Sequence, residues 1–239
     1  MGRKKKKGGD GGLPGWFATF SDMMTLLFAF FVLMFSLSTI DPVKVAAFSE
    51  GKKGGDANPD QTVKEKLDLA EIKEEFQKMI DELNMDSTAT VSQDPRGIAL
   101  EIDGDICFES SQVEIKSQLY SVLDRAIADI LTAENDIRPI IVEGHTDSDQ
   151  MRGEMAKIYP TNWELSSGRA AEVVKYLISK GVNSTRLSPT GYSDRWPFGI
   201  TWAQKRSGDV TQELIDAMNA TKDLKRKNRR IKIIIGPNY

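Results

Sequence analysis

The chain has 239 residues, with 32 Lys and Arg against 35 Asp and Glu, for a formal net charge of -3 at pH 7. This length allows one sizeable domain with accessory segments, and 40% hydrophobic residues with only 19 Gly and 9 Pro exclude collagen-like and wholly disordered chains. One Cys and one His exclude an intrachain disulfide and a structural zinc site built from these residues alone. Because the charge is nearly balanced, no nucleic-acid partner is expected.

The chain begins with a basic, glycine-rich tail, residues 1–15, in which Arg3 precedes four consecutive lysines. Residues 16–39 are almost entirely apolar and, as a helix, are about 36 Å long, enough to cross a hydrocarbon core of about 30 Å. Since the positive charges precede this span, the N-terminus is expected in the cytoplasm and the remainder outside. A cleaved signal peptide is disfavoured because the apolar run is long and no cleavage site follows it.

Asp22 is the only ionisable residue of the predicted span. A carboxylate near membrane depth costs a few kcal/mol, so it is expected to be partnered, protonated or facing a water-filled path. Ser21 and Thr25 lie close to it on the helix and offer hydroxyl oxygens to the carboxyl group or to a bound cation. The alternative, a carboxylate reaching the interface, is disfavoured by the short side chain of Asp.

Two segments separate the span from the rest of the chain. Residues 40–62 comprise a short amphipathic stretch and a linker rich in Gly and polar residues. The apolar residues of that stretch are Ile40, Val43, Ala47 and Phe48. Residues 63–86 are predicted to be helical, because apolar side chains recur at spacings of three and four. These side chains, which fit either a dimer seam or docking onto the chain's own domain, are Leu69, Ile72, Phe76, Met79 and Leu83.

Residues 87–239 alternate the patterns of strands and helices. Strands are predicted at residues 88–93, 96–102, 137–144, 186–192 and 230–236, and helices at residues 112–131, 162–180 and 210–220. Strands separated by helices indicate an α/β sandwich of the α+β kind.

One constellation in this region combines an acid and a base. Asp147 ends the strand segment Glu143-Gly-His-Thr-Asp147, and Asn162 and Arg169 are seven residues apart on one helix face. A carboxylate beside a guanidinium offers an anion and a cation to a zwitterionic ligand. On residue types alone, an internal ion pair between Asp147 and Arg169 is the simpler interpretation.

The sequence resembles a known family at several motifs. HTD at 145–147, NWELSSGRA at 162–170, Arg186-Leu followed by TGY, and Asn228-Arg-Arg230 resemble the OmpA-like peptidoglycan-binding domain. The segment WFATFSDMMTLLFAFFVLMFSLSTID resembles the span of the flagellar stator B subunit, of the MotB or PomB type. The resemblance implies an OmpA-like sandwich at residues 87–239, outside the membrane, preceded by a single transmembrane helix and a plug segment.

The resemblance also implies roles for individual residues. Asp22 corresponds to an ion-carrying carboxylate, and residues 41–50 to a plug that blocks ion flow before the stator joins a motor. Asp147 and Arg169 correspond to the groups that bind the ammonium and the carboxylate of diaminopimelate in the peptidoglycan stem peptide. Further positions implied for this pocket are Thr146, Asn162, Leu165, Arg229 and Arg230. An insertion at residues 148–161 departs from the family pattern at the pocket rim.

The resulting expectation is a single-pass stator subunit of the bacterial cytoplasmic membrane. Two copies of it would sit inside a ring of MotA- or PomA-type A subunits, transport H+ or Na+, bind peptidoglycan and act indirectly on the rotor. No cofactor, metal or catalytic residue is expected. Asp22 disfavours a wall anchor without transport, and the peptidoglycan motifs disfavour the energising subunit of a biopolymer transport system. A peptidoglycan hydrolase would need an acid–base pair or a metal centre, and nothing in the sequence singles one out.

Overall fold

The computed structural model describes residues 15–37, 67–132 and 136–237. The chain divides into two units, residues 1–40 and 41–239. The predicted plug residues Ile40, Val43, Ala47 and Phe48, together with the linker that follows them, lie outside the described residues.

The first unit contains α1, Gly15–Leu37, close to the span predicted at residues 16–39. Its segment Gly15–Met34 is long and apolar enough to cross a membrane, with a mean hydropathy of 1.8. Its large apolar side chains are exposed on all sides, among them Met23 and Phe28. A helix that is apolar all round needs lipid or another protein around it.

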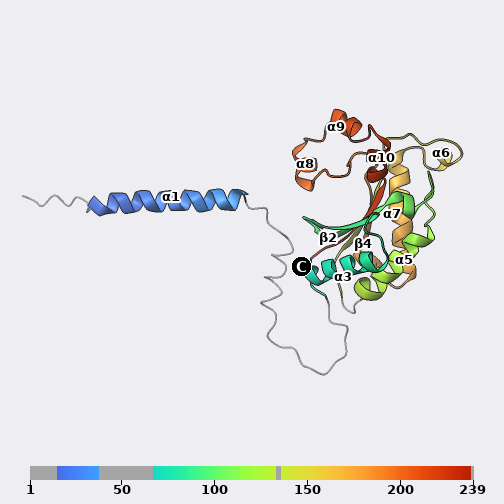
Figure 1. The fold of residues 1–239 in the computed structure, drawn as a ribbon, viewed down its shortest axis with the longest axis horizontal. Coiled ribbons are helices and arrows are strands. Elements are labelled where there is room, and N and C mark those ends of the chain that lie inside the picture. The colour runs from blue at the N-terminus through green and yellow to red at the C-terminus, as the bar shows by residue number, and fades with distance from the viewer. Residues whose placement is uncertain (1–14, 38–66, 133–135, 238–239) are drawn as a thin grey trace, which may run out of the picture. The chain divides into compact units, whose positions relative to one another are not determined.

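The second unit is built on a five-stranded sheet with the order β1-β2-β5-β3-β4 (Figure 1). The strands are β1 (Ala89–Asp94), β2 (Gly97–Asp103), β3 (Ile140–His145), β4 (Leu187–Gly191) and β5 (Arg230–Ile235). The pairs β1–β2, β2–β5 and β5–β3 are antiparallel, and β3–β4 is parallel. All five strands overlap the predicted ranges, although β3 begins at Ile140 and not at residue 137, and the mixed α/β class is confirmed.

Three longer helices pack on one face of this sheet. They are α3 (Leu69–Glu82), α5 (Ser117–Ala126), which continues as the π-helix η1 (Ile127–Leu131), and α7 (Asn162–Ser179). The short helices are α4 (Gly104–Cys107), α6 (Met155–Ile158), the 3-10 helix η2 (Ser184–Arg186), α8 (Trp202–Ser207), α9 (Gln212–Ala217) and α10 (Lys222–Asn228). The helix predicted at residues 112–131 begins only at Ser117, because Ile115 instead forms a β-bridge with Phe108.

The apolar face of α3 is buried within its own domain. A capping box of Asp68 and Glu71 fixes its first turn. Ile72 and Phe76 are completely buried in the core that also contains Leu100 of β2. Of the two predicted possibilities, a dimer seam or docking onto the chain's own domain, the apolar face of α3 therefore takes the second.

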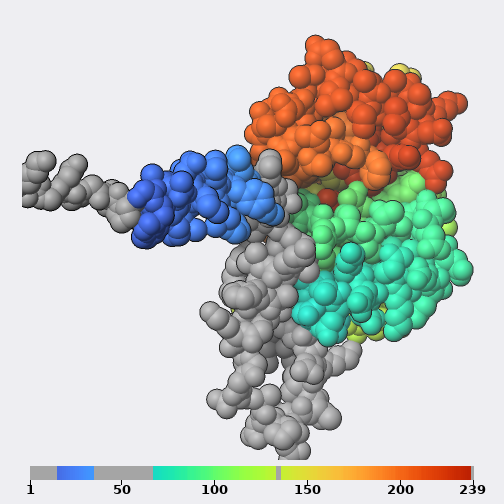
Figure 2. Space-filling view, turned by 60° about the vertical axis from the view of Figure 1, so that its left-hand side comes forward, coloured from blue at the N-terminus to red at the C-terminus, as the bar shows by residue number. Residues whose placement is uncertain are grey.

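The opposite face of the sheet carries several charged side chains, and part of residues 194–228, which we call the cap segment, lies over it. Figure 1 shows α8 and α9 of this segment across the sheet from α3 and α5, and Figure 2 shows its orange surface away from the teal surface of α3. Beneath the cap, Arg96 Nη1 lies 2.5 Å from Glu143 Oε1, and Lys232 Nζ lies 2.9 Å from Asp94 Oδ2. These charges are paired, as buried charges must be.

Candidate functional site

A cavity of about 400 Å³ lies where β3 ends beside the N-terminus of α7. Its volume is in the range of small-molecule sites. Its lining comes from four parts of the chain: the segment after β2, the loop after β3, the first turns of α7, and the junction of α10 with β5. Six of the predicted binding residues line it together: Thr146, Asp147, Asn162, Leu165, Arg169 and Arg229.

Close packing of α7 on β3 brings these residues together. A Cβ atom on Gly144 would lie 2.1 Å from the Ser166 carbonyl oxygen, so a glycine is required there. The first turn of α7 is fixed by a capping box of Thr161 and Glu164. As a result, Asn162 and Arg169 lie beside the end of β3.

Asn162 shapes the loop that follows β3. Its side-chain amide donates to the carbonyl oxygens of Asp147, at 3.0 Å, and Asp149, at 2.9 Å. From the other side, the backbone N–H of Ser148 donates to Oδ1 of Asn219 in the cap segment, at 3.1 Å. The Asp147 carboxylate is therefore presented by a loop that is held from two directions.

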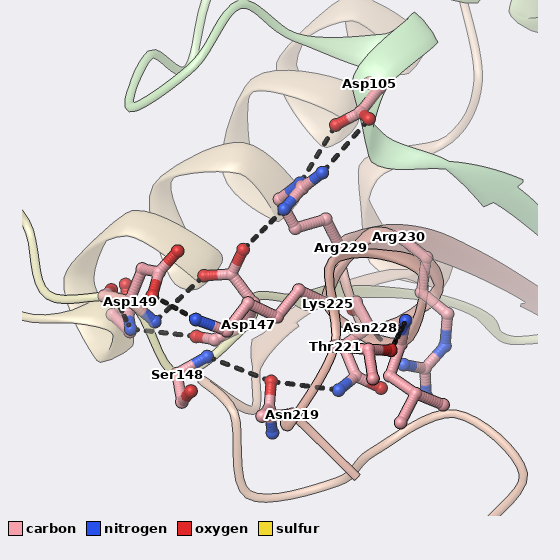
Figure 3. A network of polar contacts seen from close by, with 12 residues as sticks. Asp105, Asp147, Ser148, Asp149, Asn219, Thr221, Lys225, Asn228, Arg229 and Arg230 are labelled. Carbon is pink, nitrogen blue, oxygen red and sulfur yellow. Dashed lines mark hydrogen bonds and ion pairs between the residues drawn. The ribbon is translucent and has the colours of Figure 1, made fainter.

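Asp147 is paired with Arg229 (Figure 3). Nη1 of Arg229 lies 2.6 Å from Oδ2 of Asp147, while Oδ1 of Asp147 accepts from the backbone N–H of Asp149 at 3.0 Å. The same guanidinium also contacts both carboxylate oxygens of Asp105. These ion pairs with Asp105 and Asp147 raise the pKa of Arg229.

Arg169 is held by the backbone of the segment after β2. Its Nε donates to the carbonyl oxygen of Gln112 at 2.8 Å and its Nη2 to that of Glu109 at 3.2 Å. The guanidinium lies 4.9 Å from the centroid of the Phe108 ring. Burial lowers the pKa of Arg169 to about 10, so the group stays charged at neutral pH. The side chain is 5% exposed. It is therefore a buried, oriented cation in the cavity wall.

Thr146 lines the cavity, but its hydroxyl is buried and, within the described part of the chain, unpaired. Its backbone N–H donates to the Ser193 carbonyl oxygen at 2.9 Å, but its buried Oγ1 has no hydrogen-bond partner among the described residues. A buried polar group left unpaired costs about 1–3 kcal/mol.

Of the two arginines implied for the pocket edge, Arg229 lines the cavity and Arg230 does not. Arg230 begins β5 with its side chain on the opposite face of the sheet from Ile231, where Nη2 donates to the Trp196 carbonyl oxygen at 3.2 Å and Nε contacts Glu101 at 3.2 Å. Side chains alternate along a strand, so Arg229 and Arg230 point in different directions. The sequence pattern alone did not separate the two.

His145 packs under the cap segment, as a strand-end histidine is expected to do. Its ring stacks on Tyr192, with 5.4 Å between centroids, and Nε2 lies 3.4 Å from Glu143. Burial and the nearby charge of Arg230 lower its pKa to about 3. It is therefore a neutral structural residue at physiological pH.

Several lining residues were not identified from the sequence. They are Gly104, Asp105, Phe108, Glu109, Ser110, Ser111 and Lys116 after β2, and Asp149, Gln150 and Met151 in the insertion. The only available signal was a run of polar residues directly after a predicted strand. Nothing in their spacing relates Asp105 to Arg229, 124 positions later. The insertion is part of the cavity rim, and Lys225 holds Asp149 at 2.5 Å.

In the first unit, Asp22 lies on the exposed surface of α1. The Thr25 hydroxyl donates to the Ser21 carbonyl oxygen at 2.8 Å, which leaves the hydroxyl oxygen able to accept. In the parts of the chain that the structure describes, no three His, Cys, Asp or Glu side chains gather as a metal site would require.

The mixed sheet, the apolar N-terminal helix and the cavity define a protein with a membrane-spanning candidate helix and an α/β domain that carries a ligand-sized cavity. The sequence model of the OmpA family matches residues 107–213, and the model described as membrane MotB of the proton-channel complex MotA/MotB matches residues 2–51.

Two relatives match nearly the whole chain. YtxE of Bacillus subtilis is 31% identical over 235 residues, covering 92% of this chain and 87% of the relative. Motility protein B of the same organism is 25% identical over 272 residues, covering 98% and 95%. A crystal structure of a MotB-like protein from Desulfovibrio vulgaris has the same fold, with a TM-score of 0.56 and 18% identity over 71% of this chain and 94% of that one. The chain belongs to the MotB-like family of OmpA-domain proteins.

Proposed function

We propose that this chain is a stator-type membrane subunit that binds peptidoglycan through the cavity and carries a cation at Asp22. The observation that carries the proposal is the cavity itself, in which Asp147 and Arg169 meet in a domain of the MotB-like family. In this arrangement α1 spans the cytoplasmic membrane with the N-terminus inside, and the OmpA-type domain lies outside, facing the wall.

The cavity offers complementary groups to the diaminopimelate portion of a stem peptide. The Asp147 carboxylate accepts from the ligand ammonium, and Arg169 donates to the ligand carboxylate through Nη1, for which no contact within the described residues is present. Charged hydrogen bonds in a buried site are stronger than neutral ones and fix the ligand's orientation.

The membrane part supplies energy conversion. Two copies of α1 lie within a ring of A subunits, and H+ or Na+ passes by way of Asp22. One elementary charge that crosses 100 mV releases about 2.3 kcal/mol, and loading or unloading Asp22 changes the charge that the A subunits meet. Residues 41–50 close this path until the wall domain engages. The A subunits then act on the rotor.

Wall binding is tested with the full chain in detergent, pelleted with isolated sacculi. The parent and the control Asp86→Asn, which changes an exposed carboxylate outside the cavity, are expected to co-sediment. Asp147→Asn and Arg169→Ala are expected to remain in the supernatant. Full co-sedimentation of both cavity variants would show that the wall, if bound, is bound elsewhere.

Ion transport is tested by co-expression with the A subunit. Asp22→Asn is expected to abolish motility and ion flux at normal expression, because the amide cannot exchange a proton or balance a cation. Thr19→Ser, on the same helix, is the control. Deletion of residues 41–50 is expected to make cells leak ions, provided that Asp22 is intact. Swimming by Asp22→Asn cells would remove Asp22 from the path.

A further inference from the structure

Arg229 stands between two carboxylates that come from distant parts of the chain (Figure 3). Its Nε and Nη2 contact the two oxygens of Asp105 at 2.9 and 3.0 Å, and its Nη1 contacts one oxygen of Asp147 at 2.6 Å. Asp105 thus takes two of the guanidinium's hydrogen bonds and Asp147 takes one. All three residues line the cavity.

The fold holds Asp105 in this place. The backbone N–H of Gly104 donates to the carbonyl oxygen of Arg229 at 2.7 Å, so α4 and the start of β5 are joined beside the pair. A Cβ atom on Gly104 would lie 2.8 Å from that oxygen, and a larger residue would separate the two segments. The backbone N–H of Asp105 donates to the Asp103 carboxylate at 2.9 Å. The backbone carbonyl oxygen of Asp105 accepts from Lys116 Nζ at 2.8 Å.

This sharing leaves Asp147 partly open. A carboxylate has about four positions at which it accepts hydrogen bonds, and Arg229 and the N–H of Asp149 fill two of them. Without Asp105, the Arg229 guanidinium would be free to rotate and pair with both carboxylate oxygens of Asp147, because bidentate guanidinium–carboxylate pairing is the preferred geometry. The carboxylate would then be occupied by the chain itself.

We propose that Asp105 is a positioning residue that keeps Arg229 from closing Asp147, so that hydrogen-bonding positions of the Asp147 carboxylate stay open to a ligand ammonium. This inference rests on the proposed wall binding and deepens it. Arg229 is paired with two carboxylates, so the cluster of Asp105, Arg229 and Asp147 carries one net negative charge and attracts a ligand ammonium. The ligand carboxylate is bound by Arg169, as proposed above.

The test is calorimetric titration of the full chain in detergent with two synthetic stem tripeptides, one ending in diaminopimelate and one ending in lysine. The parent is expected to bind the diaminopimelate peptide about tenfold more tightly than the lysine peptide. Asp105→Asn is expected to weaken both by about tenfold, because Arg229 then closes on Asp147. Arg229→Gln, in which no guanidinium can close on Asp147, is expected to bind both peptides more tightly than Asp105→Asn does.

The double variant Asp105→Asn/Arg229→Gln gives the decisive comparison. It is expected to bind the lysine peptide more tightly than Asp105→Asn does, since the closing group is gone. A residue that merely stabilised the fold would not be rescued by loss of its partner. Melting temperatures accompany every titration, with Asp86→Asn as control. Where Asp105→Asn melts well below the parent, Asp105→Glu, which keeps the charge, is used and is expected to retain the preference.

The outcomes separate the two proposals. A parent that binds neither peptide nor sacculi overturns wall binding and the inference with it. A parent that binds the diaminopimelate peptide, with a double variant no better than Asp105→Asn, overturns the role of Asp105 alone. An Arg229→Gln variant that binds both peptides as weakly as Asp105→Asn also overturns it.

Discussion

Asp147 forms its ion pair with Arg229, at 2.6 Å between Oδ2 and Nη1, while Arg169 donates to the backbone carbonyl oxygens of Glu109 and Gln112. The two groups expected to bind a zwitterion are thus held by different parts of the fold, and neither fills the other's hydrogen-bonding positions. An internal ion pair between Asp147 and Arg169, the simpler interpretation of the sequence, is not what the structure contains.

Replacement of Arg169 by Lys is expected to impair both binding and stability. A lysine cannot reach both carbonyl oxygens that Nε and Nη2 contact, and about 2 kcal/mol of unfolding free energy should be lost. This differs from the small effect expected for a water-exposed pair, because Arg169 is buried. Chemical denaturation and sacculus co-sedimentation measure the two effects. The control is Arg206→Lys, at an exposed arginine, and equal behaviour of the two variants would contradict the prediction.

The free energy of unfolding is expected to fall as the pH falls below the pKa of histidine in the unfolded chain. The pKa of His145 is about 3 in the fold against 6.5 when unfolded, so the unfolded chain binds the extra proton between these values. The contribution is fully present above pH 6.5 and is lost progressively toward pH 3. Between pH 7 and pH 5 the loss should be about 2 kcal/mol.

His145→Phe is the matched variant for this dependence, because Phe can stack on Tyr192 but cannot titrate. His145 is the only histidine of the chain, so the window from pH 7 to pH 5 isolates it from the carboxylates. The unfolding free energy of the variant should change little over this window. A slope as steep as that of the parent would show that another group is responsible.

Gly144→Ala is expected to disrupt the site from beneath. The added Cβ atom would meet the Ser166 carbonyl oxygen, so α7 would have to move away. This movement should lower the free energy of unfolding by about 3 kcal/mol and abolish wall binding. Gly181→Ala is the comparison, since the space there is open and only its φ of +94° opposes a side chain, at about 1–2 kcal/mol. Wild-type wall binding by Gly144→Ala would contradict this account of the packing.

Phe76→Ala tests the packing of α3. Truncation of this completely buried core side chain should lower the free energy of unfolding by about 3–5 kcal/mol. Glu74→Ala, at an exposed position, should change it by less than about 0.5 kcal/mol. Denaturation should be independent of protein concentration. A midpoint that rises with concentration would instead show that α3 is stabilised between two chains.

Local patterns predicted most of the fold. Each strand of the sheet was found at its predicted place because branched apolar residues alternate or run together there, as in the segment that became β5. α7 was predicted through its start and stop signals, with Gly181 following its end. The short helices α8 and α10 were missed because six or seven residues carry too little periodicity. The start of α5 was misplaced because the bridge between Phe108 and Ile115 is a tertiary contact.

The sequence by itself determined the apolar span with its single carboxylate, the mixed α/β domain, and the identity of Asp147 and Arg169 as candidate binding groups. These features depend on composition, periodicity and motif, all of which are local along the chain. Only the tertiary structure decided that Arg229 and not Arg230 faces the cavity, that Asp105 shares Arg229 with Asp147, and that α3 packs on its own sheet. The reason is physical, because a guanidinium pairs with the carboxylate that lies near it in space. The approach of two segments 124 residues apart in the chain is set by the packing of the whole core.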